Sequence, residues 1–195
     1  MKRIVAPAAF LSVLACLSAC TILQGHEADG IYTSPDGEFS VTEPRIGAEK
    51  VVDGSFGTGN RYVDFSMDGF WMAAGLYSVE WYKLGKPYAD DAAFVAAAKD
   101  SLPKEVAHDY GESFKPVATE VTQVNGRVAV RVVAEGVRDK LDAYWVATAI
   151  NFGDRVALVM LLAPKNTPQQ AGPASSSEAV SWHDYPAFIR SVTRH

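Results

Sequence analysis

Apolar and polar residues alternate at period two over much of this 195-residue chain, and this alternation predicts mainly β-strands. The first two strands are expected at Ile31–Thr33 and Glu38–Thr42, on either side of Ser34-Pro35-Asp36-Gly37. These four residues favour a tight turn, because proline presets its own φ and glycine tolerates a positive φ. We therefore expect the folded domain to begin at Ile31 with a β-hairpin.

The central part of the chain combines further strands with one helix. The glycine-rich segment from Gly54 to Gly59 predicts a loop, and alternating strands follow it at Tyr62–Ser66 and from Met72 to Leu84. An alanine-rich run preceded by two aspartates then predicts a helix over Asp91–Leu102. We expect the helix to stop at Pro103, because proline lacks the N–H that a helix interior needs.

Four strands with short connections follow the helix. The dipeptide Asn125-Gly126 favours a two-residue hairpin turn, because both residues tolerate a positive φ. The pattern predicts an antiparallel meander with strands at Ala118–Val124, Arg127–Val137, Leu141–Phe152 and Arg155–Ala163.

The faces of these strands indicate how they are covered. One face of the strand from Arg127 is apolar and the other carries Arg131 and Glu135, so we expect that strand to be half exposed. The run Val156–Leu162 is apolar on both faces, which requires layers above and below the sheet. The last element, Trp182–Val192, has helical apolar spacing and predicts an amphipathic helix that packs on the sheet. The expected fold class is α+β, an antiparallel sheet of about six or seven strands flanked by helices.

The first twenty residues follow a different pattern. Lys2 and Arg3 precede an apolar run that ends in Leu17-Ser18-Ala19-Cys20, and a charged start, a short apolar core and small residues are the parts of a secretory signal. The run is shorter than the roughly 20 apolar residues that span a bilayer. We therefore expect a signal peptide over residues 1–19, a tether over 20–30 and one globular domain over 31–195.

The segment Leu17-Ser18-Ala19-Cys20 resembles the lipobox at which bacterial lipoproteins are acylated and cleaved. The resemblance implies lipid attachment at Cys20, with acyl chains such as palmitate, and hence a lasting membrane anchor. Thr21 replaces the aspartate of an inner-membrane retention signal, which implies the outer membrane, facing the periplasm, in a cell with two membranes. A secreted protein with a free Cys20, or acylation at Cys16, stays an open alternative.

Charge narrows the range of partners. The chain has a formal charge of −5, and loss of Lys2 and Arg3 reduces its 18 basic residues to 16 against 23 acidic ones. This balance opposes nucleic-acid binding, which needs a basic surface. It also disfavours adhesion of the protein surface to anionic lipid, so we expect the lipid on Cys20 to provide the membrane contact.

Residues with catalytic or metal-binding patterns are sparse. No histidine lies three or four positions from another, so we expect no metal, and the chain has no Gly-x-Ser-x-Gly elbow. Gly54–Gly59 lacks the Lys-Ser/Thr of a phosphate loop, and we expect neither a cofactor nor a catalytic residue. The four histidines are His26, His108, His183 and His195.

Aromatic side chains are the one feature that could mark a binding surface. Trp and Tyr are favoured at interfaces, although packing in the core is the alternative explanation. Alternation places Tyr77 and Trp81 on one strand face, and Glu80 and Tyr82 on the other. The aromatic residues concerned are Phe70, Trp71, Tyr77, Trp81, Tyr82, Tyr144 and Trp145.

The order of elements, the Ile-Tyr-x-Ser-Pro-Asp-Gly-x-Phe-Ser-Val segment at residues 31–41 and the closing Phe188–Val192 resemble the PsbP/Mog1-like fold family. That family joins the photosystem II extrinsic protein PsbP, the nuclear transport factor Mog1 and small bacterial envelope lipoproteins. The resemblance implies an antiparallel sheet sandwiched by helices, and a role in docking onto larger complexes. The family pattern has no catalytic residues that could be assigned to this chain.

Three hypotheses of function follow. The favoured one is an accessory lipoprotein that binds a protein partner in the cell envelope. The second is a carrier or sensor of a small apolar ligand, held between the sheet and the terminal helix. The third is a hydrolase whose catalytic residues are dispersed along the sequence.

Overall fold

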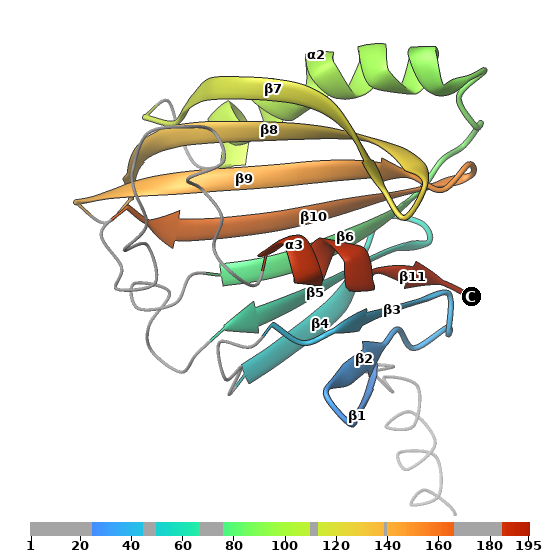
Figure 1. Ribbon diagram of the computed structural model, residues 1–195. Helices are drawn as coiled ribbons and strands as arrows, with labels where there is room; N and C mark the ends of the chain where they lie inside the picture. The colour runs from blue at the N-terminus through green and yellow to red at the C-terminus, as the bar shows by residue number, and fades with distance from the viewer. Residues whose placement is uncertain (1–24, 45–49, 67–75, 110–112, 139, 166–184) are drawn as a thin grey trace, which may run out of the picture.

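The computed structural model describes residues 25–44, 50–66, 76–109, 113–138, 140–165 and 185–195. These residues form two antiparallel sheets and two helices (Figure 1), which confirms the predicted α+β class. The proposed lipobox, Leu17–Cys20, lies outside the described residues, as do Phe70, Trp71 and the first three residues of the predicted terminal helix.

The larger sheet has seven strands in the order β4-β5-β6-β10-β9-β8-β7. Its last four strands in sequence are the predicted meander, and Asn125 and Gly126 have φ of 50° and 75° in the first turn. The strands are β4 (Lys50–Phe56), β5 (Asn60–Ser66), β6 (Leu76–Lys83), β7 (Lys115–Val124), β8 (Arg127–Arg138), β9 (Leu141–Asn151) and β10 (Arg155–Pro164).

The smaller sheet has the order β1-β2-β3-β11. Its strands are β1 (His26–Ala28), β2 (Ile31–Thr33), β3 (Phe39–Thr42) and β11 (Thr193–Arg194). The pair β2–β3 is the predicted hairpin, and Ser34 closes its turn by accepting a hydrogen bond from Gly37 N at 2.8 Å. Strand β1 lies in the segment expected to be a tether, because His26 and Ala28 pair with β2 and so extend the ordered chain beyond the expected start at Ile31.

The predicted loop over Gly54–Gly59 is correct only for residues 57–59. Gly54 lies inside β4, opposite Tyr62 on β5, and only residues 57–59 form the turn. A Cβ at position 54 would collide with the Tyr62 ring, so glycine is present here to make room for an aromatic side chain. Gly57 and Gly59 have positive φ of 57° and 76°, which suits the turn itself.

The predicted end of the helix is also wrong. Helix α2 runs over Asp91–Asp109 and passes through Pro103. Its start is capped by Asp90, whose Oδ1 accepts a hydrogen bond from Ala93 N at 2.8 Å. Leu102 and Val106, on either side of the proline, are buried, and this packing outweighs the single hydrogen bond that proline removes.

The larger sheet is the middle layer of the molecule. On one side α2 packs on β7, β8 and β9, and on the other lie the smaller sheet and α3 (Tyr185–Ser191), as Figure 1 shows. Strand β10 is buried on both faces, as predicted. The prediction of a half-exposed β8 is wrong, because Ala129 and Val133, which share the face of Arg131, are buried as well.

The space between the sheet and α3 is filled. Tyr185 donates a hydrogen bond from its hydroxyl to Val159 O at 2.8 Å, and the Phe188 ring contacts Tyr77 and Phe65 edge-on, with ring centroids 5.2 and 5.7 Å apart. Burial raises the pKa of Tyr185. The ligand site anticipated between sheet and terminal helix is therefore occupied by the protein's own side chains over the described residues.

Candidate functional site: an open aromatic and acidic sheet face

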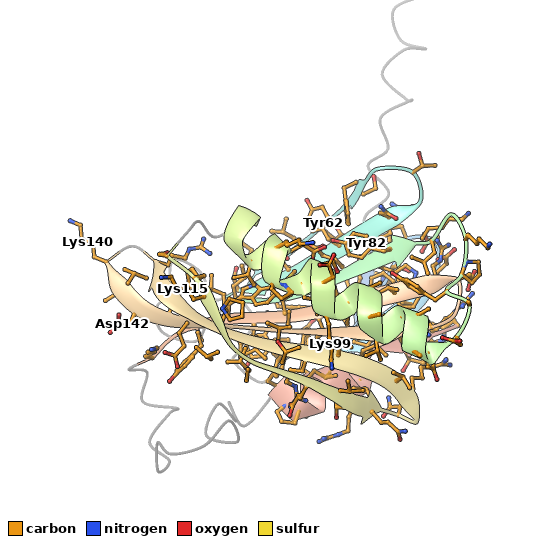
Figure 2. The ribbon with its side chains drawn as sticks, turned by 90° about the horizontal axis from the view of Figure 1, so that it is seen from above. Tyr62, Tyr82, Lys99, Lys115, Lys140 and Asp142 are labelled. Atoms are coloured by element: carbon orange, nitrogen blue, oxygen red, sulfur yellow. The ribbon has the colours of Figure 1, made fainter. Side chains whose placement is uncertain are left out.

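Helix α2 covers only part of its side of the larger sheet. Its main contacts are with β7, β8 and β9, and the same side of β4, β5 and β6 extends beyond it. Figure 2 shows Tyr62 and Tyr82 on this part of the sheet, beside α2. We call this surface the open face and define it by Val52 and Phe56 on β4, Tyr62 and Asp64 on β5, and Glu80 and Tyr82 on β6.

Strand register brings the three aromatic rings of the open face together. Tyr62 lies directly opposite Glu80, and Phe56 lies at the end of β4 next to both tyrosines. The centroid of the Phe56 ring is 5.3 Å from that of Tyr82, in an edge-on contact, and 6.3 Å from that of Tyr62. All three side chains are half-buried, so the rings form a surface that is partly accessible to solvent.

Two carboxylates lie on the same face. Glu80 accepts a hydrogen bond from the Tyr82 hydroxyl. Asp64 has no hydrogen bond or ion pair with any residue that the structure describes, and burial together with the charge of Glu80 raises its pKa to about 6. The open face therefore holds a half-buried carboxylate whose negative charge nothing in the described chain offsets.

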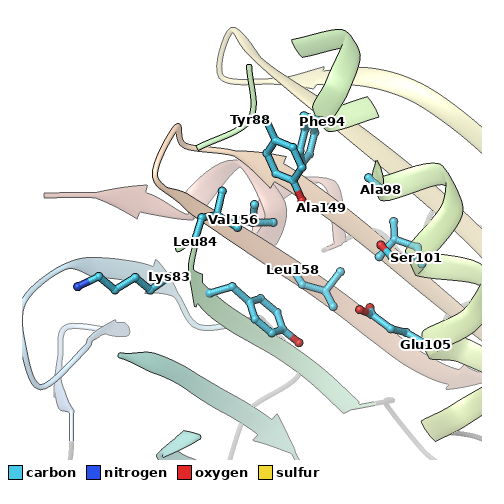
Figure 3. A pocket seen from close by; sticks show the side chains of 12 residues that line it. Lys83, Leu84, Tyr88, Phe94, Ala98, Ser101, Glu105, Ala149, Val156 and Leu158 are labelled. Carbon is cyan, nitrogen blue, oxygen red and sulfur yellow. The ribbon is translucent and has the colours of Figure 1, made fainter. Parts of the chain in front are cut away.

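A cleft of about 200 Å³ adjoins the open face, between α2 and strands β6, β9 and β10. Tyr82 belongs to both surfaces. Figure 3 shows Ser101 and Glu105 on α2 across from Leu158 on β10. Pockets for drug-sized ligands measure roughly 300–1,000 Å³, so this cleft has room for a single side chain or a very small molecule.

The opposite side of the sheet holds the start of the described chain. Asp53 on β4 accepts hydrogen bonds from Gly25 N and from the Tyr32 hydroxyl, the latter at 2.7 Å. Burial and the neighbouring Asp53 raise the pKa of Tyr32. Gly25 lies against the Tyr32 ring, where a Cβ would collide with it. The chain is therefore fixed to the domain from Gly25 onward.

The predicted Pro-Asp-Gly turn joins the two sheets. Glu38 accepts a hydrogen bond from Trp81 Nε1 at 3.0 Å and forms an ion pair with Arg155, whose side chain is 7% exposed. Asp36 pairs with Arg61 at 3.1 Å, and its pKa is lowered by hydrogen bonds from Ser34, Glu38 N and Arg61, against the opposing effect of burial. This conspicuous motif is thus explained by structure rather than by ligand binding.

Comparison with known proteins gives a fold but no sequence family. No protein-family model and no curated protein sequence matches the chain. The solution structure of cyanobacterial PsbP (CyanoP) from Synechocystis sp. PCC 6803 is similar, with a TM-score of 0.56, 11% identity, and coverage of 85% of this chain and 91% of that chain. The chain has a PsbP-like fold.

Two further solved structures are more distant. A protein from Bacteroides thetaiotaomicron matches with a TM-score of 0.49 and 11% identity, over 85% of this chain and 48% of that chain. A protein of unknown function from Pseudomonas aeruginosa matches with a TM-score of 0.34 and 15% identity, over 66% and 77%. The identity of 11% limits the likeness to the cyanobacterial PsbP structure to the fold.

On this PsbP-like fold, the predicted aromatic residues separate into two groups. Tyr77, Trp81 and Trp145 are buried in the core, whereas Tyr82 and Tyr144 are half-buried. The predicted division of β6 is confirmed, since Tyr77 and Trp81 face the smaller sheet while Tyr82 faces α2.

The histidines do not meet at a common site in the part of the chain that the structure describes. His26 is exposed on β1. At the end of the chain, His195 Nε2 lies 2.9 Å from Ser40 Oγ. His108 lies in α2, and His183 lies outside the described residues. Within the described ranges, no group of three or more His, Cys, Asp or Glu side chains could hold a metal ion, and no helix is long and apolar enough to cross a membrane.

Proposed function

We propose that this protein is a lipid-anchored accessory protein of the cell envelope that binds a protein partner through the open face. The observation that supports this role is the open face itself, where three aromatic rings and two carboxylates lie on a sheet surface beyond the cover of α2. Aromatic residues with a polar handle contribute much of the energy of protein interfaces.

The proposed lipid anchor would leave the open face accessible to a partner. Cys20 lies five residues before Gly25, whose N–H is bonded to Asp53, and five residues span at most about 18 Å when fully extended. A lipid on Cys20 would hold the smaller sheet near the membrane. The open face lies on the other side of the larger sheet, so it would point away from the bilayer toward a partner.

Binding of a small apolar ligand is the second candidate, and the cleft beside α2 is the observation that favours it. Its volume of about 200 Å³ is small for such a ligand, and α3 closes the other side of the sheet with Phe188 and Tyr185. The breadth of the open face, which extends over three strands, agrees better with a protein surface.

Site-specific photocrosslinking in intact producing cells tests the proposal. A photoreactive p-benzoylphenylalanine replaces Phe56, which conserves an aromatic ring on the open face. The control carries the same group at Val117 on β7, a position that is 56% exposed. We expect one discrete adduct with an envelope protein from position 56 and none from position 117. Absence of an adduct from position 56, or equal adducts from both, would contradict the proposal.

Fractionation of cells tests the anchor. We expect the Cys20→Ser variant to leave the membrane fraction and to lose the adduct from position 56, because no acylated cysteine then remains at the cleavage site. Cys16→Ser is the matched control, since residue 16 belongs to the segment that we propose is removed. Loss of membrane association in the Cys16 variant alone would assign the lipid to that residue and refute attachment at Cys20.

A further inference from the structure

A further cavity, about 200 Å³ in volume, lies between the β7–β8 turn and strand β11, two segments that Figure 1 shows beside each other. Its floor is apolar, because Val124, Phe152 and Val192 are at most 7% exposed. The Phe152 ring packs on Trp81, with ring centroids 5.1 Å apart, and is therefore fixed in place. The cavity thus offers a small apolar surface to a ligand.

Two arginines line the same cavity. The guanidinium of Arg127 lies over the Phe152 ring, 4.6 Å from its centroid, and Arg127 has no hydrogen bond or ion pair with any residue in the described ranges. Arg194 is oriented through its Nη1, which donates a hydrogen bond to Phe152 O at 2.9 Å and pairs with Asp154. One guanidinium is therefore held in place beside the cavity, and the other has no negative partner in the described chain.

The residues around the cavity add further positive charge. Asn125 Nδ2 donates a hydrogen bond to Arg190 O at 2.7 Å, which brings the last turn of α3 next to the cavity. The Arg190 side chain is exposed and has no ion pair within the described chain. Glu38, whose backbone O accepts a hydrogen bond from His195 N, already pairs with Arg155. The positive charge at this end of the sheet is therefore only partly offset, and it would attract a small anion.

We propose that this cavity binds a small carboxylate with a short apolar chain, its carboxylate on the Arg127 guanidinium and its chain on the apolar floor. A guanidinium donates two parallel hydrogen bonds to a carboxylate, and such charged bonds are stronger than neutral ones. Pockets for drug-sized ligands exceed roughly 300 Å³, so a volume of about 200 Å³ limits the chain to the size of one amino-acid side chain. A free carboxylic acid and the C-terminal residue of a peptide both supply this chemistry. The inference goes beyond the proposed function, because Val124 and Phe152 lie on the side of the sheet opposite the open face.

A titration with three small molecules tests this chemistry. The probe is isocaproate, added at pH 7 to the full chain with Cys20→Ser while backbone amide signals are followed by NMR. Isocaproamide keeps the apolar chain without the charge, and acetate keeps the charge without the chain. We expect the largest shifts at Asn125, Gly126 and Phe152 with isocaproate, and binding about tenfold weaker for each of the other two molecules. Equal binding of isocaproate and its amide, or shifts centred elsewhere, would overturn the inference.

A peptide distinguishes the two sources of the carboxylate. Acetyl-Gly-Ser-Gly-Leu is titrated with a free and with an amidated C-terminus, because its last residue carries the same branched chain as isocaproate. Tighter binding of the free-ended peptide than of isocaproate would assign the cavity to a peptide terminus, and the reverse would assign it to a free acid. Either result supports the site, whereas binding of neither molecule refutes it.

Variants separate recognition in the cavity from general attraction of anions. Arg127→Gln removes the unpaired guanidinium from an exposed position, and Lys99→Gln, the matched control, removes a positive charge from an exposed position on α2. We expect isocaproate to bind about tenfold more weakly to the first variant and to change by less than about twofold with the second. Arg127→Lys, which keeps the charge but loses the planar fork, should weaken binding by about threefold. Similar losses in the Arg127→Gln and Lys99→Gln variants would contradict the site.

Discussion

Two regions on the same side of the larger sheet differ in whether helix α2 covers them. Under α2, the side chains of β8, β9 and β10 are apolar, and Val130, Ala147 and Trp145 are at most 1% exposed. Beyond α2, on β4, β5 and β6, the same side carries the rings and carboxylates of the open face. The composition of each region matches its cover, because apolar side chains pack closely under a helix, whereas tyrosine rings and carboxylates suit a surface that stays in contact with water.

A second comparison concerns the carboxylates on the two sides of the sheet. Glu38, toward the smaller sheet, pairs with Arg155 and accepts a hydrogen bond from Trp81. Asp64, on the open face, has neither kind of partner within the described chain. An ion pair that stabilises the fold and a carboxylate that destabilises it therefore lie on opposite faces, which agrees with the binding role that we propose for the open face.

The largest expected effect comes from truncating the same residue type in the two regions. Phe94 on α2 is 1% exposed, whereas Phe56 on the open face is half-buried. Phe94→Ala should lower the free energy of unfolding by about 3–5 kcal/mol, because it leaves a cavity under the helix. Phe56→Ala should lower it by about 1 kcal/mol. Urea denaturation of both variants measures the difference, and equal losses would show that the open face is part of the core.

Removing the charge of Glu38 should have the next largest effect. Glu38→Gln leaves the Arg155 guanidinium, which is largely buried, without its counterion. We expect a loss of about 2 kcal/mol in the free energy of unfolding, below the usual cost of breaking a buried pair because Glu38 itself is 36% exposed. Urea denaturation at pH 7 gives the value, and an unchanged midpoint would show that the pair contributes nothing.

Removing the charge of Asp64 should instead raise the free energy of unfolding. The pKa of Asp64 is raised from 3.8 to about 6 in the folded chain, so the folded state holds its proton more tightly than the unfolded state. The stability that protonation provides is present below pH 4 and is lost as the pH rises through 6. Asp64→Asn should therefore raise the free energy of unfolding by about 1–2 kcal/mol at pH 7.5 and leave it unchanged at pH 4.

Denaturation curves of the Asp64→Asn variant at several pH values check this prediction. The groups that face Asp64 across the two neighbouring strands are Val52 and Ser78, and Glu80 is the charged neighbour that raises its pKa. A variant that is less stable than the parent at pH 7.5 would show that the Asp64 carboxylate has a stabilising partner.

The smallest expected effect concerns α2, the helix that covers one of the two regions. Asp90→Ala removes the hydrogen bond from Ala93 N that caps α2 and should cost about 1 kcal/mol. Hydrogen exchange should speed up in the first turn of α2 and stay unchanged in β4 and β5, which lie beyond the helix. Faster exchange in β4 as well would show that α2 and the open face open together.

Much of the fold could be predicted from local sequence signals. The meander β7–β10 followed from alternation and from Asn125-Gly126, because a turn that requires positive φ specifies which strands pair. The errors arose where distant residues override local preference. Gly54 lies in a strand because the Tyr62 ring lies over it, and Pro103 lies in a helix because Leu102 and Val106 are buried beside it.

The candidate site was only partly predictable. Alternation within β6 placed Glu80 and Tyr82 on the face away from the main core, as the structure shows. The meeting of Phe56 with Tyr82, and of Asp64 with Glu80, depends on the strand order β4-β5-β6, and no local signal specifies that order. The strand that carries Phe56 was not predicted either, because Gly54 within it favoured a loop.

The central claim, that the open face is covered by a partner in the cell, can be tested by cysteine labelling. Tyr62→Cys on the open face and Val121→Cys, a position on β7 that is 50% exposed, are introduced separately, and labelling by N-ethylmaleimide is compared between intact cells and purified protein. We expect position 62 to react about fivefold more slowly in cells than in the purified protein, because an interface excludes solvent, and position 121 to react equally in both. Equal reactivity of position 62 in cells and in solution would contradict the account.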